Sequence, residues 1–185
     1  DFSFIIINLS MAGQFITHLK VSFFTGIIIS FPYALYELWL FIKPGLYDNE
    51  RKYSLLFGIS GLFLFMCGVS FAYFIITPIS MQFLINYSVS NSITNTISLE
   101  NYISFLSSLI LAGGILFEMP LFIYFLTKVG LVNEKALKEY RKHAIVIILF
   151  LSALITPPDV SSQIILSLPL FLLYEVSIII SKKMS

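Results

Sequence analysis

Long apolar runs constrain this chain more than any other feature of its sequence. They occupy residues 19–42, 54–78, 102–126 and 160–180, and a shorter run covers 143–155. A helix needs about 20 predominantly apolar residues to cross a bilayer. Charged residues form 11% of the chain, far below the roughly 25% of soluble domains. The sequence therefore predicts an all-α, polytopic transmembrane helical bundle in contact with membrane lipid, with residues 1–185 as one integral membrane domain.

The run at 143–155 is too short for an ordinary crossing. At 1.5 Å per residue, its roughly 13 residues cover about 20 Å, whereas the hydrocarbon core is about 30 Å thick. We expect this segment to borrow flanking residues or to lie where the bilayer is locally thinned. Counting it, the chain has five predicted spans.

Basic residues gather on one side of the predicted membrane. Only Lys20 falls on the other side. By the positive-inside rule the basic side is cytoplasmic, so the C-terminus is inside and residue 1 is outside. A protein with both ends inside needs a sixth helix upstream, which we expect. The cytoplasmic set is Lys43, Arg51, Lys52, Lys128, Lys135, Lys138, Arg141, Lys142, Lys182 and Lys183.

The segments between the spans carry fewer signals. Residues 1–17 predict a loop with a short interfacial helix, and 81–101 predict a polar connection outside the membrane. Pro32 and Pro120 are expected to bend their helices, because proline removes a helical hydrogen bond. Asn133 is a suitable N-cap for a short charged helix.

Carboxylates inside the apolar spans are costly and therefore informative. A charge at the centre of a membrane helix costs about 2.5–3.5 kcal/mol, and Glu37, Glu118 and Glu175 lie in such spans. They predict either a polar groove that docks a partner, or protonated acids hydrogen-bonded to a neighbouring helix. Asp159, in the turn before the last span, either caps that helix through Ser161 or Ser162 or has a functional role.

An acidic corner follows the first span. Pro44 and Gly45 break the helix, and Asp48 and Glu50 then stand beside Arg51. One interpretation is a solvated loop with a weak ion pair. The other is that the rigid corner holds Glu50 at the membrane surface, where it meets a basic segment of another chain.

Other function classes find less support. Carboxylates within spans also suit a proton-coupled small-molecule transporter, the alternative function, but no internal repeat is visible. A single cysteine, Cys67, and two distant histidines form no metal motif. No HExxH motif or defensible serine–histidine pair is present. We expect no enzymatic activity, no metal, no cofactor and no nucleic-acid partner.

Three segments together resemble one family. They are SFPYALYELWLFIKPGLYDNERK at 30–52, LFEMP at 116–120 and ITPPDVSSQ at 155–163. In order and spacing they are similar to TatC, the polytopic receptor subunit of the twin-arginine protein translocase. The resemblance covers nearly the whole chain apart from the expected first helix.

The resemblance implies a cup-shaped membrane protein of six helices, in a bacterial inner membrane. It would bind twin-arginine signal peptides of precursor proteins and self-associate. With the single-span partners TatA and TatB it would export folded proteins. By the family pattern Glu50 engages the arginine pair, and Phe41, Pro44 and Arg51 belong to the same surface. Glu118 is the buried polar residue of the concave interior, and the partner-contact region includes Thr156, Asp159 and Gln163.

Overall fold

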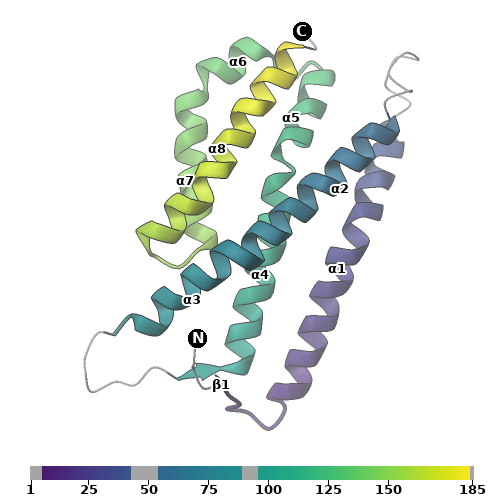
Figure 1. The fold of residues 1–185 in the computed structure, drawn as a ribbon. Helices are drawn as coiled ribbons and strands as arrows, with labels where there is room; N and C mark the ends of the chain where they lie inside the picture. Colours follow the sequence, from purple (N-terminus) through teal and green to yellow (C-terminus); the bar gives the residue numbers. More distant parts are fainter. Residues whose placement is uncertain (1–5, 43–53, 89–95, 184–185) are drawn as a thin grey trace.

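The computed structural model describes residues 6–42, 54–88 and 96–183 (Figure 1). Pro44, Glu50 and Arg51 lie outside these ranges, and the side chain of Phe41 is not described either. The elements in chain order are β1 (Ile6–Ile7), α1 (Gly13–Ile42), α2 (Ser54–Phe71), the π-helix η3 (Ala72–Ile76), α3 (Thr77–Asn86), β2 (Ile97–Ser98), α4 (Leu99–Phe117), α5 (Met119–Lys128), α6 (Glu134–Glu139), α7 (Arg141–Ile155) and α8 (Val160–Lys182).

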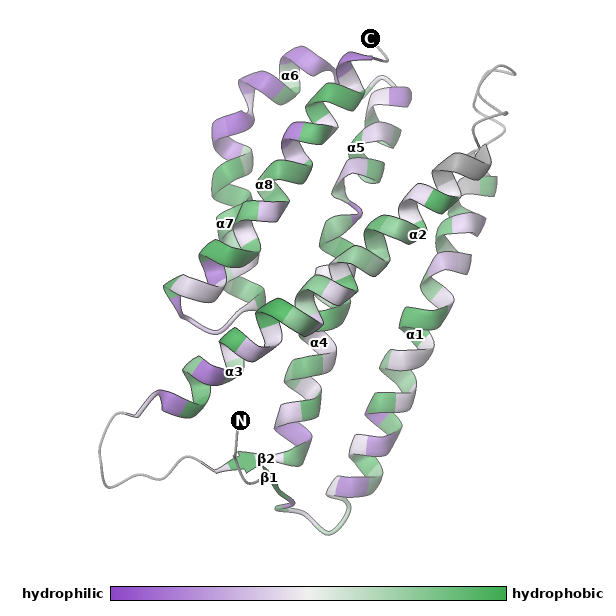
Figure 2. Cartoon of the chain, in the orientation of Figure 1, coloured by the Kyte–Doolittle hydropathy of each residue, from purple (hydrophilic) through white to green (hydrophobic). Residues whose placement is uncertain are grey.

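The predicted helical membrane architecture is confirmed in its main lines. Within the described residues, four stretches are long and apolar enough to cross a membrane. Figure 2 shows the apolar residues between hydrophilic ends at α6 and at the starts of α1 and α4. Helix α7 has only 15 residues and is not among the four. The stretches are Gly13–Leu38, Gly58–Asn86, Leu99–Lys128 and Val160–Lys182.

The helices form two packed groups, which are joined where α4 continues into α5. Helix α1 packs against α4 and α2, and α2 crosses α4 diagonally (Figure 1). Helices α5, α6 and α7 pack against α8. The C-terminus and α6 lie at one end of the bundle, while β1, β2 and the end of α3 lie at the other. The basic residues of α6 and α7 lie at the first end (Figure 1), which is the end that the positive-inside rule predicts to be cytoplasmic.

Glycines let α2 and α4 approach closely at their crossing. Gly68 and Gly113 face each other so tightly that a Cβ on Gly68 would lie 2.5 Å from the carbonyl oxygen of Gly113. A Cβ on Gly114 would lie 2.6 Å from the ring of Phe65. Small residues permit such contacts between membrane helices, where lipid removes the hydrophobic driving force. Phe31 of α1 stacks on Phe65 with their ring centroids 4.1 Å apart, and this contact joins α1 to the crossing of α2 and α4.

The second span is longer than the sequence predicted. Helix runs without interruption from Ser54 to Asn86, whereas we expected it to end near Pro78. The reason is the π-turn η3, in which Thr77 donates its backbone N–H and its hydroxyl to the carbonyl of Ala72. Pro78 then falls in the first turn of α3, where a missing N–H is tolerated. Residues 81–86 are therefore helical.

The prediction of a short interfacial helix within residues 1–17 is wrong for the residues that the structure describes. Ile6–Ile7 pairs with Ile97–Ser98 as a short parallel sheet, and α1 already begins at Gly13. Beside this pairing, Lys20 Nζ lies 2.7 Å from Glu100 Oε1 and 3.0 Å from Ser104 Oγ. The one basic residue expected on the outer side thus ties α1 to α4.

Two predicted N-caps are confirmed. The Asn133 side chain accepts a hydrogen bond from the backbone of Ala136 at 2.8 Å and starts α6. Asp159 Oδ2 accepts from the backbone N–H of Ser162 at 2.7 Å and starts α8. Each satisfies one of the donors that a helix start leaves unpaired.

Candidate functional site

Glu118 occupies the break between α4 and α5. Helix α4 ends at Phe117, and α5 resumes at Met119 with Pro120 in its first turn, where a bend was expected. The side chain is buried, and neither carboxylate oxygen has a hydrogen-bond partner among the described residues. It faces Gly61 of α2, where an added Cβ would lie 3.6 Å from Oε2. An unpartnered buried carboxylate is costly, which favours a functional reason for its presence.

The other two intramembrane acids lie on different helices and have local partners. Glu175 of α8 accepts a hydrogen bond from Arg141 Nη2 at 2.8 Å, at the start of α7. Glu37 is exposed on α1 and accepts a hydrogen bond from the hydroxyl of Tyr33. Among the described residues, no hydrogen bond joins any two of Glu37, Glu118 and Glu175. The structure therefore does not bring the three acids into one site.

The ion pair at Glu175 is expected to contribute little to stability. Both side chains are partly exposed, at 44% for Arg141 and 31% for Glu175. Exposed pairs typically contribute about 0.2–1 kcal/mol. A double-mutant cycle with Arg141→Gln and Glu175→Gln, read by thermal unfolding of the purified protein, should give a coupling energy in that range. A coupling of several kcal/mol would show instead that the pair is desolvated in the membrane.

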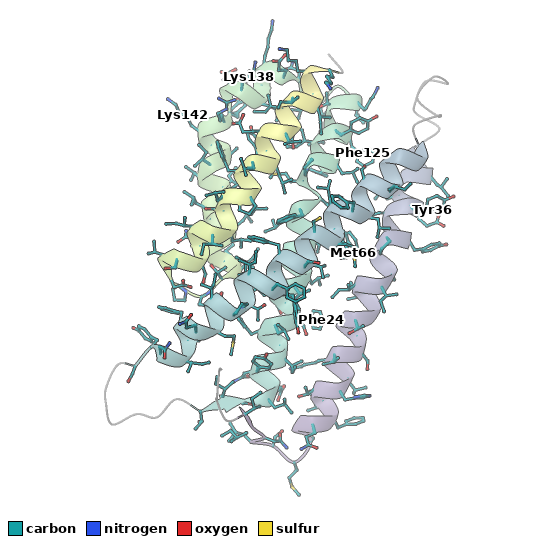
Figure 3. All side chains as sticks on the ribbon, in the orientation of Figure 1. Phe24, Tyr36, Met66, Phe125, Lys138 and Lys142 are labelled. Atoms are coloured by element: carbon teal, nitrogen blue, oxygen red, sulfur yellow. The ribbon has the colours of Figure 1, made fainter. Side chains whose placement is uncertain are left out.

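The end of the bundle that holds α6 is basic, and side-chain hydrogen bonds hold its elements together. Figure 3 shows Lys138 and Lys142 at this end, on α6 and α7. The hydrogen bond from Lys138, whose Nζ lies 2.6 Å from Glu134 Oε1, lowers the pKa of the Glu134 carboxyl. The Tyr174 hydroxyl of α8 donates to the carbonyl of Leu137 at 2.8 Å and anchors α6. This end therefore presents a positively charged surface on a fixed scaffold.

The three residues of the predicted partner-contact region do lie together, around the turn between α7 and α8. Thr156 Oγ1 donates to the carbonyl of Ser152 at 2.8 Å, and Gln163 Nε2 donates to the carbonyl of Leu149 at 3.1 Å. Asp159 lies between them as the cap of α8. Beside the turn, α7 and α8 form an apolar groove of about 310 Å³, lined by Ile145, Ile148, Leu149, Ile164, Ser167, Leu168 and Phe171.

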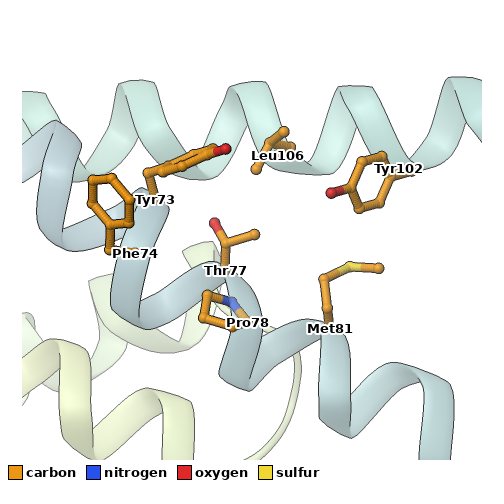
Figure 4. A pocket seen from close by; sticks show the side chains of 7 residues that line it. All are labelled: Tyr73, Phe74, Thr77, Pro78, Met81, Tyr102 and Leu106. Carbon is orange, nitrogen blue, oxygen red and sulfur yellow. The ribbon is translucent and has the colours of Figure 1, made fainter. Parts of the chain in front are cut away.

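Sequence reasoning missed two pockets at the end of the bundle opposite α6 (Figure 1). One holds about 280 Å³ between α4 and the η3–α3 segment, and Figure 4 shows Thr77 and Pro78 facing Tyr102 and Leu106 across it. The other holds about 340 Å³ between α3 and the α7–α8 turn. The second pocket depends on the continuation of α3 past Pro78, a residue from which the sequence predicted the end of the helix.

Comparison with known proteins identifies the family of this chain. The family model described as "Sec-independent protein translocase protein (TatC)" matches residues 3–169. The chain belongs to the TatC family. It is 44% identical over 177 residues to a TatC of Helicobacter pylori strain J99, covering 96% of this chain and 71% of that protein. It is 39% identical over 178 residues to a TatC of Aquifex aeolicus, covering 96% of this chain and 74% of the relative.

The fold agrees with solved structures of the family. A crystal structure described as "Twin Arginine Translocase Receptor- TatC in DDM" matches with a TM-score of 0.81 and 38% identity, over 96% of this chain and 79% of that one. As a TatC-family chain, it is a multi-pass membrane protein of the twin-arginine translocase. It is a transport protein and not an enzyme. The resemblance inferred from the three segments at 30–52, 116–120 and 155–163 is confirmed.

Proposed function

We propose that this TatC-family chain captures the twin-arginine motif of signal peptides at its cytoplasmic face, through the corner at residues 44–51. The observation that supports this most is the match to a structure described as a twin-arginine translocase receptor, over 96% of the chain. The residue assigned to the arginine pair is Glu50. Carboxylates accept two parallel hydrogen bonds from a guanidinium group, and charge-assisted bonds are about twice as strong as neutral ones. Phe41, Pro44 and Arg51 complete the proposed surface.

The proposed topology has five crossings, with α7 as a short one. Residues 1–185 then act as a single integral membrane domain in a bacterial inner membrane, with a cytoplasmic C-terminus. The supporting observations are the four long spans and the basic cytoplasmic end. At about 22 Å, the 15 residues of α7 are shorter than the usual hydrocarbon core of about 30 Å, and of the two accommodations expected from the sequence we favour a locally thinned bilayer beside α8. A thinned bilayer would lower the barrier to passage of cargo.

In the proposed mechanism, Glu118 receives the signal peptide in a cup-shaped concave face. Its unpartnered, buried oxygens are ready to accept donors from a polar group that enters between α2 and α4. The apolar part of the signal peptide would follow the same face. The carboxylate is therefore retained for function and not for stability.

Replacing Glu118 with glutamine should distinguish a role of this carboxylate in export from a role in stability. We expect the Glu118→Gln protein to be as thermally stable as the wild type or more so, because the variant removes a carboxylate without a partner. Export of a twin-arginine precursor should fall several-fold. Glu175→Gln is the matched control, since it has an ion-pair partner, and it should leave export nearly unchanged. The proposed role would be contradicted if the Glu118→Gln protein unfolded at a lower temperature and export fell only as much as the amount of folded protein.

The α7–α8 groove is the proposed site for TatA and TatB. An apolar groove beside the turn that holds Thr156, Asp159 and Gln163 suits a single membrane helix that carries one polar side chain. Self-association of several copies in the translocase is part of the same proposal. Partner helices docked here would cover the short spans.

The experiment that tests the proposed function is precursor binding to membranes that contain the complete protein. A twin-arginine precursor should bind at least about tenfold more tightly than the same precursor with a lysine pair, because lysine cannot form the bidentate contact. Equal binding of the two precursors would contradict recognition of the arginine pair.

A further inference from the structure

Asp159 has a carboxylate oxygen that the helix cap does not use. Oδ2 accepts the Ser162 backbone N–H, but Oδ1 has no hydrogen-bond partner among the described residues. The residue is only 7% exposed. A cap alone needs one oxygen, and asparagine or serine would supply it. The second oxygen carries charge into a buried place, where an unpaired charge is costly. Its presence points to a positively charged group that binds there.

The residue lines the pocket of about 340 Å³ between α3 and the α7–α8 turn. The walls are fixed, because Ser80 of α3 and Ser162 of α8 meet through their hydroxyls at 3.2 Å and both are fully buried. Gln82 and Asn86 offer two further carbonyl acceptors from successive turns of α3. The remaining lining residues are Ile79, Phe83, Tyr87 and Ser161. Phe83 and Tyr87 lie with ring centroids 5.4 Å apart.

Among the residues that the structure describes, none brings a basic side chain to this pocket. No lysine or arginine in ranges 6–42, 54–88 and 96–183 lines it. Lys20, the one basic residue of the outer side, is bonded to Glu100 and Ser104 at the base of α1. The pocket therefore combines a carboxylate and amide oxygens without a basic partner. Three acceptors suit the three N–H donors of a primary ammonium group.

The position of the pocket identifies the source of the ammonium group. Helix α7 spans about 22 Å, so its outer end lies about 8 Å short of a normal hydrocarbon boundary if Arg141 stands at the cytoplasmic surface. In Figure 1 the α7–α8 turn stops well before the level reached by the outer ends of α1 and α4. Lipid headgroups must follow this step to stay hydrated, which brings them to the turn.

We propose that this pocket binds the headgroup of an ethanolamine phospholipid from the outer leaflet, with the ammonium on Asp159 Oδ1, Gln82 and Asn86. The phosphate then lies at the start of α8, where Val160 and Ser161 are exposed and the helix dipole favours an anion. Phe83 and Tyr87 add aromatic faces next to the cation. Choline headgroups have no N–H donors, so the site discriminates against them. This inference concerns the lipid beside the short spans and is independent of arginine-pair recognition.

The test is lipid retention by the complete protein, purified in mild detergent and measured by native mass spectrometry. An equimolar mixture of ethanolamine and choline lipids with identical chains should give about tenfold more bound ethanolamine lipid. The preference should fall with each methyl group in the mono- and dimethyl-ethanolamine series. Asp159→Asn keeps the cap oxygen and removes the charge, so the helix should persist while the preference drops towards one to one.

Two further variants control for loss of outer-side charge and for misfolding of Asp159→Asn. Glu100→Gln removes an outer-side acid that is paired with Lys20 and should leave the preference unchanged. Gln82→Leu lies away from the α8 cap and should reduce the preference even if Asp159→Asn does not fold. Equal retention of the two lipids by the wild type, or a preference that survives both Asp159→Asn and Gln82→Leu, would overturn the proposal. A crosslink from position 86 to a lysine of a partner polypeptide would also overturn it, if the protein in the same membranes bound ethanolamine and choline lipids equally.

Discussion

Replacing Gly68 with alanine is expected to separate α2 from α4 and to destabilise the whole bundle. The added Cβ would lie 2.5 Å from the carbonyl oxygen of Gly113 and 2.8 Å from Cβ of Phe117. A backbone oxygen cannot rotate away as a flexible side chain can, so the helices must move apart. Overpacking typically costs about 1–3 kcal/mol, and the crossing also positions Glu118 through Gly61. Thermal unfolding of the purified protein should show a midpoint several degrees lower, with less protein in the membrane.

Gly58 supplies the control for this prediction. It lies on the same helix, but an added Cβ there meets nothing within 4 Å. Gly58→Ala should be neutral or should stabilise by about 0.5–1 kcal/mol, the usual advantage of alanine over glycine in a helix. If Gly68→Ala and Gly58→Ala have the same effect, close packing of α2 on α4 does not hold this fold together.

Replacing Glu50 with glutamine is expected to abolish most twin-arginine export while the protein remains in the membrane. Glutamine keeps the size of the side chain but offers one neutral acceptor in place of a bidentate, charged one. Losing one partner of a hydrogen-bonded charge pair typically costs about 2–5 kcal/mol, which corresponds to a loss in affinity of about 30-fold to several thousand-fold. Export of a folded twin-arginine precursor, measured at equal protein levels, gives the result.

Asp48→Asn is the matched control, because it removes the same charge from the same corner two residues away. Export should stay within about twofold of the wild type if charge alone matters little at this distance from the contact. An equal loss in both variants would show that the overall charge of the corner attracts precursors. An intact export with Glu50→Gln would remove Glu50 from the proposed contact.

Local signals in the sequence were sufficient for much of the fold. The apolar runs predicted the long helices, because hydrophobic length decides what a bilayer accepts. Asn133 and Asp159 were recognised as caps, because each stands directly before its helix and a cap depends on a few neighbouring residues. The break at Glu118 followed from Pro120 for the same reason.

Features that depend on distant parts of the chain could not be predicted. The continuation of helix past Pro78 needs the π-turn at Ala72, which packs against α4. The pairing of Ile6 with Ile97 and the bond from Lys20 to Glu100 join residues about 80 or more positions apart. The pocket at Asp159 exists because α3 reaches the α7–α8 turn. Long-range contacts of this kind leave no pattern in either segment alone.

The most direct test of the proposed receptor role is a photoreactive group at position 50, in membranes that contain the complete protein. It should crosslink to a twin-arginine precursor, and the crosslink should disappear when the arginine pair becomes a lysine pair. Photoreactive groups on the α6 surface, at position 139 for example, show whether precursor approaches other parts of the cytoplasmic face. Crosslinks from position 139 with none from position 50 would contradict the proposed site and place arginine recognition elsewhere on the protein.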